Sequence, residues 1–125
     1  MLKAKLIAMN DEDEYEVTLE INGATLMCFA VVCPYKINVG EYYSVEFSFN
    51  MEDGIEPEVL EKEAYGFEKN DRNYGYVLRG KLSKNKLDLG PFSIEDDYLK
   101  QLSNLDGKYI QIAVQGLWVT FLPMI

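Results

Sequence analysis

The strongest constraint on the fold of this chain is an alternation of apolar and polar side chains that ends at Asn22-Gly23. In residues 14–21, EYEVTLEI, the alternation is strict, which is typical of a β-strand with one face exposed to solvent. An Asn-Gly pair favours a type I′ turn, because this turn requires positive φ angles at both central residues. The pattern therefore predicts a β-hairpin whose second strand begins at Ala24.

A two-residue turn also fixes which residues of the two strands face each other. Val17 is expected opposite Cys28, and residues paired in this way share a face of the hairpin. The polar face is then expected to carry apolar side chains beside its glutamates. Its members are Glu14, Glu16, Glu20, Met27, Phe29 and Val31. Either later segments of the chain cover these apolar side chains, or they form a surface on which a partner binds.

The same two-residue period recurs along most of the chain and predicts a mainly β fold. Further strands are expected at 2–9, 42–49, 74–83, 86–94 and from 108 onward, with a bulge or bend at Gly116. Residues 58–69 are open between a short helix after Pro57 and a strand, with the strand preferred for 60–69. One short helix is expected near 95–105, with its start close to Ser93.

About seven short strands with regularly spaced turns predict a single antiparallel β-barrel, OB-like or of a related topology, that spans residues 1–125. A β-sandwich is the alternative architecture. The chain has no run of 18 apolar residues, and its first residues lack the apolar segment of a signal peptide, so a cytoplasmic protein is expected.

The charge of the chain is strongly negative and unevenly distributed. The formal net charge is −9, and residues 1–70 carry 5 Lys against 15 Asp and Glu. Residues 71–125 carry 7 Lys and Arg against 6 Asp and Glu, so the acidic excess lies in the first half. Such a field attracts basic partners and disfavours nucleic acid and anionic membranes.

The residue types available argue against an enzyme. The chain contains no histidine, which excludes Ser-His and Cys-His nucleophiles and histidine-bearing zinc sites. It has no glycine-rich phosphate-binding motif, and the acidic stretches at 10–14 and 50–58 do not match an EF-hand loop. No catalytic residue, cofactor site or metal site is predicted.

The two cysteines do not form a predictable site either. Cys28 and Cys33 point to opposite faces of an extended strand and lie roughly 16 Å apart along it. A disulfide needs Cα atoms within about 7 Å of each other, so no internal disulfide is expected. Cys28 is expected to be a small buried apolar residue.

The first functional hypothesis is a non-enzymatic binding protein that recognises another protein with a basic surface, for example as an immunity or inhibitor protein. Tyr42 joins the hairpin residues as a candidate contact, because protein interfaces favour tyrosine. The alternative is an OB-like domain that binds single-stranded nucleic acid or docks onto such a protein, which is disfavoured by the net charge. Its candidate surface comprises Arg72, Tyr74, Arg79, Lys81, Lys84 and Lys86. A scaffold or oligomer subunit is a third option.

Overall fold

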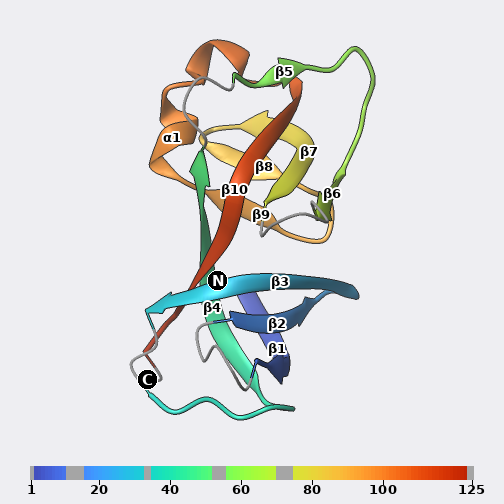
Figure 1. Cartoon of the computed structure of the whole chain (residues 1–125). Coiled ribbons are helices and arrows are strands. Elements are labelled where there is room, and N and C mark those ends of the chain that lie inside the picture. Colours follow the sequence, from blue (N-terminus) through green and yellow to red (C-terminus); the bar gives the residue numbers. More distant parts are fainter. Residues whose placement is uncertain (1, 11–15, 33–34, 52–55, 70–74, 124–125) are drawn as a thin grey trace.

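The chain folds mainly as antiparallel β-structure, as the alternation predicts (Figure 1). The computed structural model describes residues 2–10, 16–32, 35–51, 56–69 and 75–123. This part contains ten strands: β1 (Leu2–Met9), β2 (Glu16–Ile21), β3 (Ala24–Val32), β4 (Tyr42–Met51), β5 (Glu58–Val59), β6 (Gly66–Lys69), β7 (Tyr76–Ser83), β8 (Lys86–Asp88), β9 (Ser93–Glu95) and β10 (Tyr109–Phe121). One short helix, α1 (Asp97–Lys100), and a 3₁₀ turn (Ser103–Leu105) precede β10.

Five strands form a ring of pairings in the lower part of Figure 1. β1 pairs with β2 and β4, β2 pairs with β3, and β10 pairs with both β4 and β3. Only the β3–β10 pair among these is parallel. Alternate side chains point into the ring and make its apolar interior, whose most deeply buried members include Leu6, Leu19, Leu26, Val45, Val119 and Phe121.

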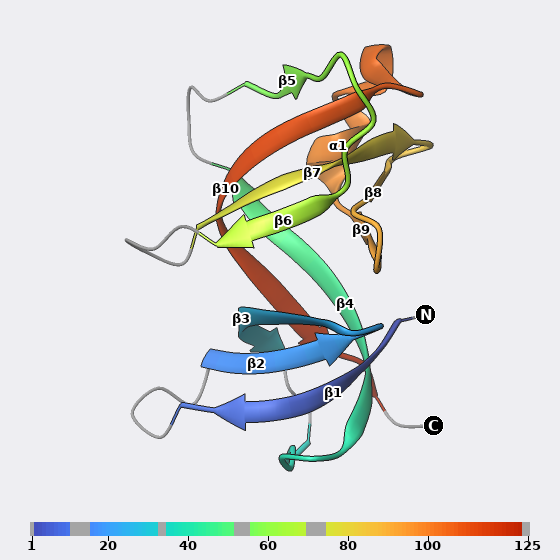
Figure 2. The same cartoon turned by 90° about the vertical axis from the view of Figure 1, so that its right-hand side faces the viewer.

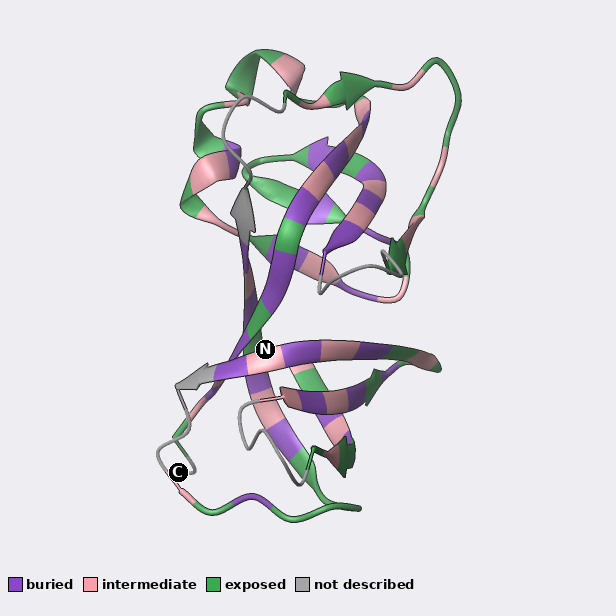
Figure 3. Cartoon of the chain, viewed as in Figure 1, coloured by how far each residue is buried: buried purple, intermediate pink, exposed green. Residues whose placement is uncertain are grey.

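A second group of strands is built on the first half of β10, above the ring (Figures 1 and 2). One edge of β7 pairs with β10, and its other edge pairs first with β6 and then with β8. β9 extends this sheet beyond β8, and β5 pairs with the free side of β10. β10 thus belongs to both groups. Along each of its halves, buried residues alternate with more exposed ones (Figure 3).

Aromatic rings join the two groups where β4 leaves the ring. The ring centroids of Phe47 and Phe92 are 5.2 Å apart, and Phe92 also packs on Phe67 at 5.7 Å. Phe49 meets Tyr98 of α1 edge-on at 6.2 Å. Through these contacts the buried side chains of both groups form one continuous cluster.

One buried hydroxyl links the upper group to β3. The described β3–β10 pairing begins at Phe29, two residues after Met27. There the hydroxyl of Tyr76 donates to the Met27 carbonyl at 2.8 Å and accepts from the Met27 N–H at 2.9 Å. Tyr76 therefore makes the two hydrogen bonds that a neighbouring strand would otherwise supply. Burial raises the pKa of this hydroxyl above its usual value, so it stays protonated and able to donate.

The predicted tight turn at Asn22-Gly23 is confirmed, with φ angles of 49° and 85°. A second two-residue turn joins β7 to β8, where Lys84 and Asn85 have φ angles of 51° and 67°. The register of β2 against β3 is also the predicted one, with Val17 opposite Cys28. These agreements follow because a two-residue turn leaves little freedom in how the strands pair.

The predicted number of about seven strands is wrong. Residues 58–69 form two short strands, β5 and β6, which pair with different neighbours and are separated by irregular backbone. Residues 86–94 were expected as one strand but are divided into β8 and β9. The turn between them contains Gly90 at φ 105° and Pro91, which has no N–H to donate to a ladder.

The expected helix is present but starts later than the sequence suggests. Ser93 does not cap it, because Ser93 pairs with Asp88 at the start of β9. Asp96 is the N-cap instead, and its carboxylate accepts from the Tyr98 N–H at 2.9 Å. The other oxygen of the same carboxylate accepts from the Phe49 N–H at 3.3 Å, which ties α1 to β4.

We expect Gly80→Ala to destabilise the fold strongly. A Cβ atom at Gly80 would lie 1.8 Å from the backbone carbonyl oxygen of Asp88, where β7 passes from β6 to β8. Because backbone atoms must move to relieve the clash, the loss should be about 2–3 kcal/mol in urea unfolding. Ser83→Ala, at an exposed position of the same strand, is the control and should change stability by less than about 0.5 kcal/mol.

We expect Tyr76→Phe to lower the free energy of unfolding by about 1–2 kcal/mol, because both backbone groups of Met27 lose their partner. Tyr109→Phe is the matched control, since the Tyr109 hydroxyl lies 3.1 Å from the exposed hydroxyl of Tyr65. Urea denaturation of the two variants measures the difference. Equal stability of the two variants would contradict a linking role for Tyr76.

Candidate functional site

The outer face of the β2–β3 hairpin carries the residues that the sequence singles out. Glu16 and Thr18 on β2, and Met27 and Phe29 on β3, are all partly exposed on this face. Glu16 lies directly opposite Phe29, and Thr18 lies opposite Met27. The backbone N–H of Met27 donates to the Tyr76 hydroxyl, so β7 holds β3 at its edge. Acidic and apolar side chains therefore share this face, as the hairpin register predicts.

The parallel pairing of β3 with β10 extends this face by one further aromatic residue. Trp118 is the register partner of Phe29, and it is 36% exposed although every other residue from Leu117 to Phe121 is buried or half-buried. Glu16, Phe29 and Trp118 therefore lie side by side on three adjacent strands. We call these three residues the cross-strand row.

Trp118 faces outward because the burial pattern of β10 changes phase at Gly116. Before Gly116 the buried residues are the even-numbered Ile110, Ile112 and Val114. After Gly116 they are the odd-numbered Leu117, Val119 and Phe121. β10 runs through Gly116 as one continuous strand, and its pairing with β4 is regular from Gly116 onward. Trp118 is not among the residues that the sequence singles out, although it is the one tryptophan of the chain and lies two residues after Gly116.

The cross-strand row ends in a carboxylate on one side, and a second carboxylate lies beyond its other end. Asn10 donates to Oε2 of Glu16 at 3.1 Å and holds that carboxylate at one end. At the other end Ser48 is the register partner of Trp118, and the exposed Glu46 is the partner of Thr120. Glu46 is thereby a diagonal neighbour of Trp118, about 7–8 Å away between Cα atoms, a distance that long side chains bridge.

The structure does not bring the other predicted contacts to this row. Glu20 is exposed at the far end of β2, about 13 Å along the strand from Glu16. Tyr42 is 67% exposed but belongs to the β1–β4 pair, where it lies opposite Lys5. The Nζ atom of Lys5 is 6.0 Å from the centre of the Tyr42 ring. Glu14 and the side chain of Val31 lie outside the described residues.

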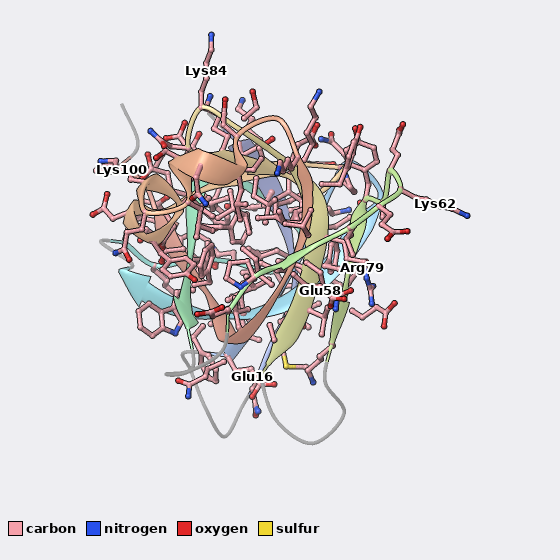
Figure 4. The ribbon with its side chains drawn as sticks, turned by 90° about the horizontal axis from the view of Figure 1, so that it is seen from above. Glu16, Glu58, Lys62, Arg79, Lys84 and Lys100 are labelled. Atoms are coloured by element: carbon pink, nitrogen blue, oxygen red, sulfur yellow. The ribbon has the colours of Figure 1, made fainter. Side chains whose placement is uncertain are left out.

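The predicted basic surface is divided, and two of its four described cations form ion pairs. Arg79 lies on β7, where Nη1 forms an ion pair with Glu68 at 2.8 Å and Nε donates to Gln111 at 2.7 Å. Lys86 forms an ion pair with Glu95 at 3.2 Å. Lys81 and Lys84 are exposed, whereas Arg72 and Tyr74 lie outside the described residues. Seen from above, Lys84 and Arg79 project from different sides of the molecule, and Glu16 lies opposite Lys84 (Figure 4).

A groove of about 770 Å³ lies between the ring and the upper group. Its lining mixes cations and anions: Lys84, Lys86, Lys100, Glu46, Glu95, Asp96 and Asp97. Lys86 is paired with Glu95, and Lys100 is paired with Asp97 at 3.2 Å. The groove is therefore polar and close to electrically balanced, which does not select a strongly charged ligand of either sign.

Cys28 is buried inside the ring, as the sequence predicts. Burial raises the pKa of its thiol to about 12, so it carries no thiolate at neutral pH and is a poor nucleophile. Cys33 lies outside the described residues. In the described part of the chain, no group of three or more Cys, Asp or Glu side chains is arranged to hold a metal ion.

The described helical segments include none with the length and apolar character needed to cross a lipid bilayer.

These observations define a mainly β protein with a five-strand ring and an exposed aromatic row bordered by acids. The chain belongs to the family described as "Uncharacterised conserved protein UCP019853", whose profile matches residues 1–122. No curated protein and no solved structure is significantly similar to the chain.

We expect the buried thiol of Cys28 to make the protein less stable at alkaline pH. The thiol ionises near pH 9 in the unfolded chain but near 12 when folded, so its stabilising contribution is complete below pH 9 and is lost as pH rises toward 12. The free energy of unfolding should fall by up to about 1.4 kcal/mol per pH unit above pH 9 from this group. Urea unfolding at pH 8 and 10 measures this slope, and Cys28→Val should have a shallower one. An unchanged slope in the variant would contradict the assignment.

Proposed function

We propose that this protein is a non-enzymatic binding protein that docks a partner protein with a basic surface onto the cross-strand row. The observation that carries the proposal is the exposed Trp118 beside Phe29, with Glu16 in the same row. Tryptophan is among the residues that contribute most binding energy at protein interfaces. A tryptophan left one-third exposed on a well-packed sheet is thus a natural anchor for a partner.

The strand pairings support a finer description of the fold. We infer that the ring is an OB-like barrel, because its pairings run β1–β2–β3–β10–β4 and return to β1. In OB-folds the second and third strands present the ligand-binding face. In this chain the equivalent strands are β2 and β3, which carry Glu16 and Phe29.

The charges around the row favour a basic protein over nucleic acid. Glu16 and Glu46 border the aromatic residues, and the chain carries a net charge of −9. Phosphates would be repelled by these carboxylates, whereas lysine and arginine side chains would be attracted. Two of the cations on the alternative surface are already paired, Arg79 with Glu68 and Lys86 with Glu95.

The proposal predicts that Trp118→Ala weakens partner binding by roughly thirtyfold, since truncating an interface anchor costs about 2 kcal/mol. The partner would be recovered on the immobilised protein at low salt, and its Kd would then be measured with purified components. The double variant Glu16→Lys/Glu46→Lys should abolish binding at low salt by reversing the charge beside the row.

Tyr42→Ala is the matched control, because it removes the most exposed aromatic residue of the described chain from outside the row. Its Kd should stay within about twofold of the unmodified protein. Recovery of no basic partner, or full binding by the double lysine variant, would refute the proposed function. Tighter binding of a single-stranded oligonucleotide than of any basic protein would favour the nucleic-acid alternative.

A further inference from the structure

The cross-strand row places aromatic rings next to carboxylates, and one kind of side chain can contact both. Phe29 and Trp118 present aromatic surface, and carboxylates stand at either end of it. Adjacent strands are about 4.8 Å apart, so Glu16 lies about 10 Å from Trp118 across the row. A single extended side chain is long enough to lie over an aromatic ring and reach one of these carboxylates.

We propose that the partner anchors itself here through an arginine, whose guanidinium stacks on Trp118 and pairs with Glu16 or Glu46. This inference rests on the proposed function and names the group that the row recognises. Among aromatic rings, the indole of tryptophan attracts cations most strongly. The flanking acids supply the countercharge that such a stacked cation needs, and Glu46 is within reach of Trp118 as its diagonal neighbour.

The geometry favours arginine over lysine. A guanidinium is planar, so it can stack on the indole while its edge donates two parallel hydrogen bonds to a carboxylate. An ammonium group is compact and strongly hydrated, and it cannot make both contacts with the same geometry. The row therefore discriminates between two residues of equal charge, which a purely electrostatic surface would not do.

Trp118 is the one tryptophan of the chain, so its fluorescence reports on the row directly. Two matched short peptides serve as probes, one of alternating glycine and arginine and the other of alternating glycine and lysine. At low salt the arginine peptide should change the Trp118 emission and bind about tenfold more tightly than the lysine peptide.

Calorimetric Kd values of variants test whether the preference for the arginine peptide over the lysine peptide depends on the row. Trp118→Leu should bring the arginine and lysine peptides to within about twofold of each other, because it keeps an apolar side chain but removes the indole. Tyr42→Leu is the control and should keep the full preference. Glu16→Gln with Glu46→Gln should weaken both peptides and weaken the arginine peptide more.

The possible outcomes separate this inference from the proposed function. Equal binding of both peptides, with both weakened by the glutamine variants, would overturn the arginine anchor and leave a basic partner in place. No binding of either peptide, together with unchanged partner binding by Trp118→Leu, would overturn both. A larger change of Trp118 emission with a single-stranded oligonucleotide than with either peptide would also overturn the arginine anchor.

Discussion

The double use of β10 is the constraint on which the rest of this structure depends. Its first half pairs with β7 and β5, and its second half pairs with β4 and β3. The side of β10 that is buried differs between its two halves, and the change occurs at Gly116. The upper group and the ring are consequently parts of one hydrogen-bonded sheet with one continuous core.

The candidate site follows from this constraint. Because the phase of β10 changes, Trp118 points away from the core and comes to lie beside Phe29. The ring alone would leave the backbone of Met27 without a partner at the point where β10 turns toward the upper group. The hydroxyl of Tyr76 occupies that point and keeps β3 in place as the central strand of the row.

The sequence predicts the elements whose geometry is decided locally. The hairpin at Asn22-Gly23 and its register are set by turn chemistry and alternation, and both agree with the structure. The sequence does not predict elements that depend on a distant strand. The strands β5 and β6 are too short to show a period, and they exist because β10 and β7 offer them an edge.

The candidate site was predicted only in part for the same reason. Glu16 and Phe29 were identified because the hairpin register is local. Trp118 joins them through a pairing between segments that are far apart in the chain, and no local pattern reveals that pairing. The engagement of Arg79 by Glu68 was likewise hidden, because it depends on β6 lying beside β7.

The position of β10 in the chain has a consequence for the order of folding. β1, β2 and β3 are joined by short connections, so they can pair soon after they are synthesised. The ring needs the second half of β10, which follows the other described strands of the ring in the chain and therefore leaves the ribosome after them. Until then the edges of β3 and β4 and much of the ring interior remain exposed, which is the state in which β-rich chains aggregate. The negative charge of the first half of the chain would make such incomplete chains repel one another until β10 has paired.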